Sequence, residues 1–592
     1  MCGIAGIVDF ERPAEASRSA IAAMQRALAR RGPDGQGDFF EGAVALGHTR
    51  LAIQDSESGA QPLLSPDGRH VLVYNGELAN ADELRRTYAR EFPFNGKSDT
   101  EVVLAALTLD GVGALRRFSG MFALFLWDRE QQRGVAARDT LGVKPLLYTR
   151  EGSQLRFASE AKALIAARGT SPAVNMDALV EWALVPQFSG VDRAPFAGVE
   201  ILPPGGLLEV DRSGVRVSRW SRFRPASKPM DEAALLDDVL RRLYMGTNSV
   251  AASDWPTGVF LSGGLDSSLI AEASGFSLDE LRAYTIRFEG QDRFDYAHSA
   301  ITFEDDTPFA EQVAKELELE HTFVDVRREA LPSDLETLAK INDLVPAWEQ
   351  ELAQHHLSRV ASQSVKVVLI GDAADETHFG YHFLLDPSAT KSIDGLLARL
   401  GAPARLQMLN PELRASALET LASRYRDVVA DAGQRWGTRD QDVLATTALI
   451  VERWLPRLLH NGDVHTMAFG LEARVPFCSA NLLDLAERVT PAIGLKNGIE
   501  KWHLRQGAEG DLPKEILWRR KSALPKDQGA EPVYRAEAER LLADPDPLVK
   551  RLLDVAFLRE LARAPRKLLE VERSMLFQAI VLTHWARHHG VR

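Results

Sequence analysis

The stretch that decides the fold of the larger part of this 592-residue chain is VFLSGGLDSS, residues 259–268. Its apolar start is typical of a buried strand, its glycines of a tight turn and its end of a helix. The backbone N–H groups of such a loop and the helix N-terminus form a phosphate-binding nest. Asp266 would repel bare phosphate, so the motif indicates a nucleotide bridged by Mg²⁺. The alternative is a turn whose serines and aspartate only cap the helix.

A second loop of the same kind supports the nucleotide interpretation. The stretch VVLIGDAADETHFGY, residues 367–381, is another strand that ends in an acidic loop, with Asp372, Asp375 and Glu376. The carboxyl ends of parallel strands gather on one edge of a sheet. We therefore expect both loops to face one magnesium–nucleotide.

The composition is that of an ordinary globular protein, with 45% hydrophobic and 26% charged residues. A formal net charge of −13 argues against nucleic acid as a main partner. The two cysteines, Cys2 and Cys478, form no disulfide framework and suit a reducing compartment. The sequence shows neither an apolar run long enough for a membrane span nor a signal peptide. A cytoplasmic enzyme is expected.

The texture of the chain changes once. Up to about residue 215, short β-like runs separated by Gly, Pro, Asn and Asp predict packed antiparallel sheets. A polar, proline-bearing stretch follows, and we place a linker at 216–232. From 233 to 592, strands such as RAYTIRF and HTFVDV alternate with helical stretches, which predicts a mostly parallel sheet, and the last part is mainly helical.

The chain begins MCGIAGIVDF, which places Cys2 directly after the initiator methionine. A cysteine in a first strand is usually a packing residue. If Met1 is removed, however, Cys2 carries a thiol and a free α-amine, and the amine can act as base to its own nucleophile.

Two series of motifs resemble a known family. MCGIAGI, RRGPDG (30–35), HTRLAI (48–53), YNGEL (74–78), KSDTE (97–101), GMFALFLWD (120–128) and RDTLGVKPL (138–146) resemble, in order, the glutaminase domain of the N-terminal-nucleophile (Ntn) amidotransferases. SGGLDSS, GDAADE, GLEARVPF (470–477) and EKWHLRQ (500–506) resemble the synthetase domain of glutamine-hydrolysing asparagine synthetases.

The resemblance implies a fold for each domain. The first, residues 2–215, is expected to be an α+β domain, an Ntn-type antiparallel β sandwich flanked by helices. The second, residues 233–592, is expected to be an α/β domain with a mainly parallel sheet of the adenine nucleotide α-hydrolase type. Its phosphate-binding loop (PP-loop) spans 262–268, and its C-terminal part is helical.

In the first domain the resemblance implies a glutaminase site. Cys2 is expected to attack the glutamine side-chain amide, with its α-amine as base. The oxyanion hole corresponds to the Asn75 side chain and the Gly76 N–H. An ordinary turn would also explain the Asn75-Gly76 pair.

Three further residues are expected to bind the glutamine. Arg50 corresponds to the residue that binds the α-carboxylate, and Asp99 and Glu77 to groups that receive the α-ammonium. Alternatively, Arg50 is a surface ion pair and Asp99 caps the helix suggested by TEVVLAAL.

In the second domain the resemblance implies that ATP activates a carboxylate as an acyl-adenylate, which ammonia then attacks. Asp266 and Asp375 would hold Mg²⁺, and Lys501 would stabilise charge on the intermediate unless it is a solvated surface lysine. Arg474 could form an ion pair that supports the domain interface, and Cys478 is expected to pack. The expected ATP-binding residues are Leu261, Ser262, Gly263, Gly264, Asp266, Ser267, Ser268, Ile286, Ile370 and Gly371, of which Ser262, Gly264 and Ser267 would hold pyrophosphate.

The acceptor segment departs from the family pattern. Where relatives carry an acidic segment, this chain reads INDLVPAWEQELAQHH, residues 341–356. Either Leu344 and Trp348 give the pocket an apolar wall, or Asp343, Glu349 or Glu351 supplies its acidic groups. The segment 290–308 is also longer than usual, so the identity of the acceptor stays open.

The sequence therefore predicts an ATP- and Mg²⁺-dependent ligase that hydrolyses glutamine and amidates a carboxylic acid, with aspartate to asparagine first. The same chemistry on another acid is the main alternative. An intramolecular cyclase of the β-lactam synthetase kind and a catalytically dead homologue are the others. The expected partners are glutamine, ATP and the acid, without nucleic acid or membrane, and the resemblance allows a homodimer.

Overall fold

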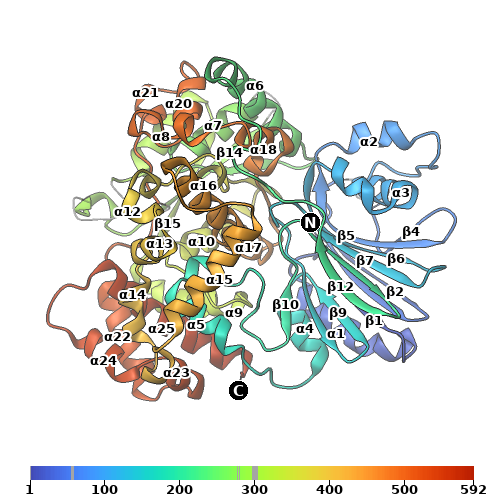
Figure 1. Cartoon of the computed structure of the whole chain (residues 1–592), viewed down its shortest axis with the longest axis horizontal. Helices are drawn as coiled ribbons and strands as arrows, with labels where there is room; N and C mark the ends of the chain where they lie inside the picture. The colour runs from blue at the N-terminus through green and yellow to red at the C-terminus, as the bar shows by residue number, and fades with distance from the viewer. Residues whose placement is uncertain are drawn as a thin grey trace.

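A computed structural model describes residues 2–54, 59–275, 278, 280–296, 304–523 and 525–591. In Figure 1 the sheets of the N-terminal part, in blue to green, lie at the right, and the rest of the chain lies at the left. Two sheets pack together in the first part and one parallel sheet lies in the second. The α+β domain followed by an α/β domain is thus confirmed.

The N-terminal domain is built on two antiparallel six-stranded sheets. In spatial order, the first contains β10 (Val199–Ile201), β8 (Leu147–Glu151), β9 (Gln154–Ala158), β1 (Cys2–Asp9), β3 (Val44–Arg50) and β2 (Gly35–Glu41). The second contains β12 (Gly214–Arg219), β11 (Gly206–Asp211), β7 (Arg133–Arg138), β6 (Gly120–Asp128), β5 (His70–Leu78) and β4 (Leu63–Leu64).

Strand β1 lies at the centre of this domain, and every one of its residues is buried. Successive side chains of a strand point to opposite faces. Ile4 and Val8 enter the core between the two sheets, while Ala5 and Ile7 pack in the core that includes the outer helices. The helices that flank the sandwich are α1 (Arg18–Leu28), α4 (Ala161–Arg168), α2 (Ala81–Tyr88) and α3 (Asp99–Asp110).

The sandwich continues slightly past residue 215, because β12 pairs with β11 as far as Arg219. The next helix, α6 (Glu232–Ala251), begins one residue before the expected start of the second domain. Asp231 caps α6 by accepting hydrogen bonds from two backbone N–H groups.

The second domain contains a five-stranded sheet in which every neighbouring pair is parallel. Its spatial order is β15 (Glu320–Val326), β14 (Leu281–Phe288), β13 (Thr257–Phe260), β16 (Val367–Leu369) and β17 (Glu472–Arg474). The order reverses between β13 and β16, and ligands of such sheets bind at the carboxyl ends beside the reversal. Both acidic loops found in the sequence follow these two strands.

Helices surround the parallel sheet and form the C-terminal part, whose last elements lie at the bottom left of Figure 1. Those that contact the sheet include α7 (Leu265–Ser274), α8 (Thr307–Glu316), α10 (Glu351–Ala361) and α17 (Leu455–Met467), while α9 (Leu331–Ile341) packs mainly against other helices. The others include α15 (Ala417–Asp431), α16 (Arg439–Leu449), α22 (Glu531–Ala543), α24 (Val555–Arg563) and α25 (Glu570–His589). Cys478 is buried among them, as expected of a packing residue.

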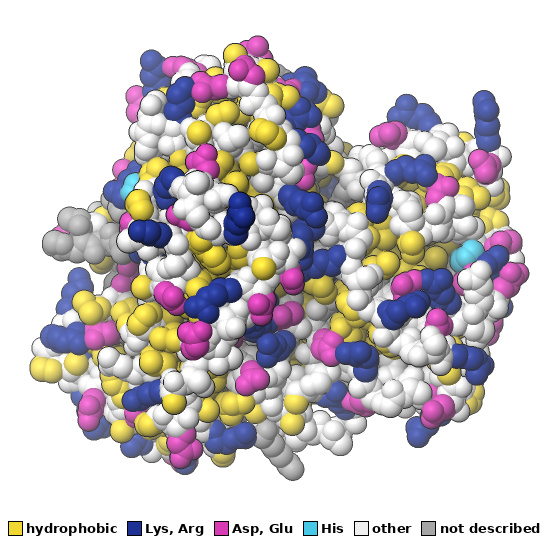
Figure 2. Space-filling view, in the orientation of Figure 1, with side chains coloured by type: hydrophobic (Ala, Val, Ile, Leu, Met, Phe, Trp, Pro, Cys, Tyr) yellow, Lys and Arg dark blue, Asp and Glu magenta, His cyan; other side chains and the backbone are white. Residues whose placement is uncertain are grey.

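The molecular surface carries both signs of charge. On the face drawn in Figure 2, Lys and Arg side chains alternate with Asp and Glu over both halves of the molecule. Segment 290–308, which we expected to be unusually long, lies partly outside the described residues, at 297–303.

Candidate active site

Cys2 begins β1 and lies beside Arg50, because the antiparallel register of β1 and β3 pairs these residues. Burial raises the pKa of the Cys2 thiol, although the positive chain terminus and Arg50 act in the opposite direction. A thiol that stays protonated at neutral pH is a weak nucleophile and needs a base within reach. The α-amine that removal of Met1 would free is such a base on the same residue.

Asn75, on β5, places its side-chain amide against Cys2. Its Oδ1 accepts a hydrogen bond from the Cys2 backbone N–H at 3.0 Å. Its Nδ2 is buried and has no hydrogen-bond partner among the described residues. An unpaired buried donor costs about 1–3 kcal/mol, so this amide is held ready for an acceptor that arrives with a ligand. At Gly76 a Cβ would come within 2.5 Å of the Met121 carbonyl oxygen, so β5 and β6 need glycine here.

Asp99 and Glu77 form the acidic side of this site. Asp99 Oδ2 accepts hydrogen bonds from the Tyr74 hydroxyl and the Leu78 N–H, each at 3.0 Å. The cap of α3 is Ser98, which accepts from a backbone N–H, so Asp99 is not the N-cap. Burial raises the pKa of Asp99, and it raises that of Glu77 to about 8. An added cation, such as an α-ammonium group, would lower both pKa values.

Two residues of β17 reach this site from the other domain. Arg474 Nε donates to Glu472 Oε1 at 2.5 Å, and Arg474 Nη2 lies 3.4 Å from Glu77 Oε2. Arg474 Nη1 also donates to the Val250 carbonyl at 2.8 Å. The interface ion pair that the sequence left as one alternative for Arg474 therefore exists. Glu472 was not predicted from the sequence, although it belongs to the same GLEARVPF stretch.

A second charged cluster joins the backbone of Cys2 to the other domain. Arg31 Nε donates to the Cys2 carbonyl at 3.2 Å, and Arg31 Nη1 donates to Asp463 Oδ2 at 2.6 Å and to Glu160 Oε1 at 2.9 Å. Lys144 Nζ donates to the Ala473 carbonyl at 3.2 Å. This cluster was not predicted from the sequence, because its members come from distant segments. Arg31 and Lys144 do fall inside two of the family-like motifs, which was the available signal.

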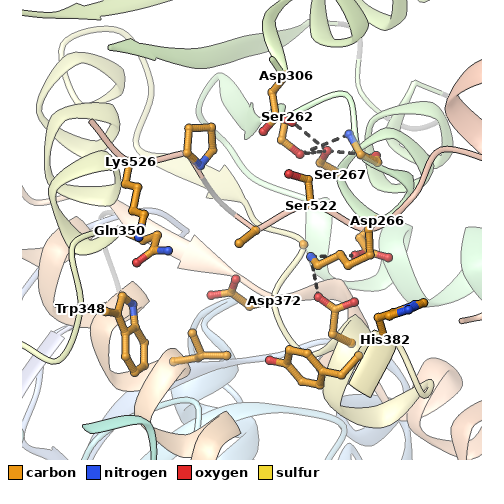
Figure 3. Close-up of a pocket in the computed structure, with 18 of the residues that line it drawn as sticks. Ser262, Asp266, Ser267, Asp306, Trp348, Gln350, Asp372, His382, Ser522 and Lys526 are labelled. Atoms are coloured by element: carbon orange, nitrogen blue, oxygen red, sulfur yellow. Dashed lines mark hydrogen bonds and ion pairs between the residues drawn. The ribbon is translucent and has the colours of Figure 1, made fainter. Parts of the chain in front are cut away.

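The second site is a cavity of about 760 Å³ at the carboxyl ends of β13 and β16. Figure 3 shows residues of both strand-end loops pointing into it. The predicted residues that line it are Leu261, Ser262, Gly264, Asp266, Ser267, Ile286, Ile370, Gly371, Asp375 and Lys501. Gly263 and Ser268, which were expected to bind ATP, are absent from the lining.

The first loop is shaped by its glycines and serines. Gly263 has a φ of +64°, and a Cβ there would come within 2.3 Å of the Ala310 nitrogen, so no larger residue fits. The hydroxyls of Ser262 and Ser267 lie 3.1 Å apart, and the Gly264 N–H donates to Ser262 Oγ at 3.3 Å. These weak internal bonds leave hydroxyl and N–H donors that an anion could recruit.

An ammonium group lies between the two loops. Lys501 Nζ donates to both Asp266 oxygens at 2.7 Å and to Asp375 Oδ1 at 2.6 Å. Lys521, which the sequence analysis missed, lies 2.6 Å from Asp375 Oδ2. Burial acts to raise the pKa of Asp375, but the two lysines hold it well below its usual range. Lys501 is only 1% exposed and has a φ of 52°, so it is a fixed member of the site rather than a solvated lysine.

Asp372 adds a third carboxylate, seen at the centre of Figure 3. Burial raises its pKa to about 6, and its Oδ2 has no hydrogen-bond partner among the described residues. Within the described residues no group of three His, Cys, Asp or Glu is arranged to hold a metal ion. Mg²⁺ is usually held by one or two carboxylates together with substrate phosphates, and the loop carboxylates fit that mode.

The acceptor segment lines the cavity only in part. Trp348 and Glu349 line it, but Leu344 does not. Leu344 is buried in a separate small pocket between the domains, where it packs against Gly190 near Arg457. The expectation that Leu344 forms the acceptor wall is therefore wrong, because this side chain fills the domain interface.

The acidic residues of the segment are paired inside the protein. Asp343 accepts from the N–H of Ala161, the first residue of α4, and lies 3.6 Å from His460. Glu351 lies 3.2 Å from His465. Neither lines the cavity, so of the three acidic candidates only Glu349 does.

Comparisons with known proteins match two separate parts of the chain. Residues 1–221 match the family model of the glutamine amidotransferase domain, and residues 239–587 match that of asparagine synthase. Asparagine synthetase [glutamine-hydrolyzing] 3 of Bacillus subtilis is 30% identical over 546 residues, 89% of this chain and 87% of the relative. Asparagine synthetase B [glutamine-hydrolyzing] of Escherichia coli is 28% identical over 537 residues, 88% of this chain and 81% of the relative.

Among the described helices, none combines the length and apolar character that a membrane span requires.

Proposed function

The chain belongs to the family of glutamine-hydrolysing asparagine synthetases, and on this premise we propose that Cys2 and the Lys501 cluster are its two reaction centres. Glutamine-dependent amidation is the family's chemistry. The assignment of its steps to individual residues is our proposal, and it rests on the contacts described above.

At the first centre, the Cys2 sulfur attacks the side-chain carbonyl carbon of glutamine. The α-amine takes the thiol proton and passes it to the departing nitrogen, so ammonia leaves and a thioester remains. Water then hydrolyses the thioester to glutamate. The Asn75 Nδ2 and the Gly76 N–H stabilise the oxyanion. The unpaired state of that Nδ2 supports this role.

The glutamine itself is held by opposite charges. Arg50 binds its α-carboxylate, and Asp99 and Glu77 receive its α-ammonium. The buried carboxyls support this assignment, because a substrate cation would offset the burial that raises their pKa values.

At the second centre, a carboxylate oxygen attacks the α-phosphorus of ATP, and pyrophosphate leaves. Ammonia then attacks the acyl carbon, and AMP leaves. Ser262, Gly264 and Ser267 hold the pyrophosphate, and Lys501 lies where negative charge develops.

Mg²⁺ belongs to this proposal as well. Asp266 and Asp375 would hold it, with Asp372 as a nearby third carboxylate. When bound, the ion would offset the negative charge of the nucleotide phosphates. The unpartnered, buried Oδ2 of Asp372 supports the fit.

The acceptor has two candidates. Aspartate is the first, because the relatives are named asparagine synthetases. The second is a carboxylic acid with a larger apolar body, and the cavity wall favours it. Trp348, Tyr381, Phe383 and Trp454 all line the cavity, whereas the charged groups of aspartate need polar partners when water is removed.

Three further expectations stay predictions. They are the domain limits of 2–215 and 233–592, a homodimeric assembly, and a cytoplasmic location. A sedimentation measurement on the full chain tests the second.

The observation that carries the proposed function is the position of Lys501 between the carboxylates of both strand-end loops. The experiment is a pyrophosphate-release assay with ATP, Mg²⁺ and ammonium chloride, run with aspartate and with a panel of other carboxylic acids. We expect AMP and pyrophosphate in equal amounts with at least one acid. ADP and inorganic phosphate as products would overturn the adenylation step.

A further inference from the structure

The cavity extends beyond the nucleotide loops to a second end formed by different elements. Its lining includes Leu400, Gly401 and Arg405, at α13 (Ile393–Arg399) and α14 (Ala402–Arg405), and Val571 and Ser574 at the start of α25. Figure 1 shows α7, which follows the nucleotide loop, near the top of the second domain and α14 in its lower half, with α12 (Pro387–Thr390) and α13 between them. A ligand that reaches both ends is therefore elongated.

Arg405 places a buried positive charge at this far end. Its side chain belongs to a residue only 7% exposed. Nη1 donates to the Leu400 carbonyl at 2.6 Å and Nη2 to Ser574 Oγ at 3.5 Å, while Nε has no acceptor among the described residues. Burial lowers the pKa of Arg405 to about 10, and no acidic neighbour offsets this effect. A buried cation without a counter-ion is costly unless a ligand supplies one.

The carboxylates around this end already have cationic partners. Glu349 lies 2.9 Å from Lys526 Nζ and 3.2 Å from Arg573 Nε. Glu570 lies 2.8 Å from Lys526 Nζ. Among the described residues no carboxylate lies within ion-pair distance of Arg405. The described part of the protein therefore supplies no counter-ion to this guanidinium, and a bound anion would complete its charge pairing.

An aromatic stack provides the surface of the middle part. The ring centroid of Tyr381 lies 4.8 Å from that of Trp454, with an interplanar angle of 25°. It lies 5.3 Å from the ring centroid of Phe383, with an interplanar angle of 21°. Trp454 ends the π-helical turn Ile450–Trp454, a local distortion that is frequent at functional sites. All three rings line the cavity, so a planar or apolar body can pack on them.

We propose that the acceptor is an elongated carboxylic acid with a second anionic group, which Arg405 binds while the apolar body lies along Tyr381, Phe383 and Trp454. This inference rests on the proposed function, because it names the acceptor of that same site. The reacting carboxylate lies at the Lys501 cluster. Arg405 is then a specificity-determining residue that selects acids with negative charge at both ends.

The test compares two acids that differ only in the distal group. The probes are 3-(4-carboxyphenyl)propanoate and its amide, 3-(4-carbamoylphenyl)propanoate, assayed by pyrophosphate release with ATP, Mg²⁺ and ammonium chloride. A hydrogen-bonded charge is worth about 1.5–3 kcal/mol, so we expect kcat/KM to favour the diacid by about 10- to 150-fold. Arg405→Met should bring this preference close to one, mainly through the KM of the diacid, and Arg405→Lys should restore part of it.

A matched control is Arg426→Met, which removes an exposed arginine of α15 that pairs with Glu419. The diacid preference should stay unchanged in this variant. Near-ultraviolet circular dichroism of each variant reports whether the fold is intact, and binding of the diacid to folded Arg405→Lys keeps the test valid if Arg405→Met does not fold.

Several outcomes would overturn the inference. The first is that the wild-type enzyme does not bind the diacid or does not prefer it to the amide. The second is that Arg405→Met lowers kcat/KM for the diacid and for the amide by the same factor. A rise in the KM of ATP with an unchanged diacid preference would mean that Arg405 binds a phosphate group instead. If aspartate gives AMP and pyrophosphate while the diacid preference is absent, only this inference fails. If no acid gives pyrophosphate, the proposed function fails first.

Discussion

Arg474 on β17 lies 3.4 Å from Glu77 on β5, measured from Nη2 to Oε2, and so links the two domains at the proposed glutaminase site. The same guanidinium donates to Glu472 and to the Val250 carbonyl, which fixes it from the synthetase side. A movement of β17 would therefore change the electrostatic environment of a carboxylate that we expect to bind glutamine. The loop after the neighbouring strand β16 carries Asp375, so the pair is well placed to couple the two reactions.

Arg474→Lys is expected to uncouple glutamine hydrolysis from ATP-dependent synthesis. Lysine keeps the charge but cannot reach Glu472, Val250 and Glu77 at once, because it lacks the planar fork of arginine. Coupling energies of about 1–3 kcal/mol correspond to 5- to 150-fold effects, so we expect at least about 5-fold more glutamate per pyrophosphate released. The measurement is the ratio of the two products, with Arg426→Lys as the control. An unchanged ratio would show that the ion pair is only structural.

Glu77→Gln is expected to change both the binding of glutamine and the pH dependence of the free energy of unfolding. The pKa of Glu77 is raised to about 8, chiefly by burial. Between its unfolded value, near 4.5, and 8, the native state therefore binds more protons than the unfolded state, and stability falls as pH rises. The slope is about 1.4 kcal/mol per pH unit for one proton. The Glu77→Gln substitution should remove this pH dependence of stability, because the new side chain does not titrate. The KM for the substrate glutamine should rise, because the variant lacks a carboxylate that we expect to bind the α-ammonium group.

The check on Glu77→Gln is urea unfolding at pH 5 and pH 8. We expect the variant to gain stability relative to the wild type between the two pH values, by up to about 3 kcal/mol. A parallel pH dependence in both proteins would mean that Glu77 is already ionised in the native state.

Asn75→Ala tests the oxyanion hole. Loss of one such donor typically lowers kcat about 10²- to 10³-fold, and we expect this for glutamine-driven turnover.

Cys2→Ala should abolish glutamine-driven turnover and keep synthesis from ammonium chloride. Equal losses with glutamine and with ammonium would argue against separate sites, and full retention of Met1 in active enzyme, seen by intact mass, would argue against the α-amine as base.

The candidate residues of the glutaminase site lie together in the structure because the motifs that carry them are local. Cys2 begins β1, and Asn75, Gly76 and Glu77 share one strand, so the motif order places them together once the strands pair. The residues of the expected PP-loop stay together for the same reason, since its glycines and serines are consecutive.

The interface could not be predicted in this way. Arg31 binds Asp463 across 432 positions, and Arg474 meets Glu77 from the other domain. No periodicity marks such pairs, because they depend on how two finished domains pack. The prediction that Leu344 lines the acceptor pocket was wrong for the same physical reason. Its apolar character indicated a buried position correctly, but not which of two neighbouring pockets it fills.

Asp375→Asn is expected to abolish ATP-dependent synthesis while glutamine hydrolysis continues. The substitution removes a carboxylate that Lys501 and Lys521 both contact, and two buried ammonium groups then lose a shared counter-charge. Binding of magnesium–ATP should weaken at least about tenfold, because one of the two carboxylates that would hold Mg²⁺ is lost. Isothermal titration with a non-hydrolysable ATP analogue measures this directly. Unchanged affinity together with full synthesis would exclude Asp375 from the site.

Trp348 and Leu344 lie four residues apart in the acceptor segment, yet the structure assigns them different roles. Trp348 lines the cavity and Leu344 packs against Gly190 between the domains. Leu344→Ala should therefore lower the free energy of unfolding by about 2–5 kcal/mol, the usual cost of a buried leucine, and leave the KM of the acceptor unchanged. Trp348→Ala should do the opposite, raising the KM of an aromatic diacid about tenfold or more, since a ring contact contributes about 0.5–1.5 kcal/mol beyond its buried area. Denaturant unfolding and pyrophosphate-release kinetics on both variants measure the two effects. If aspartate is the best acceptor and Trp348→Ala does not change its KM, the aromatic wall takes no part in acceptor recognition, and Glu349, the acidic residue of the segment that lines the cavity, is the next residue to replace.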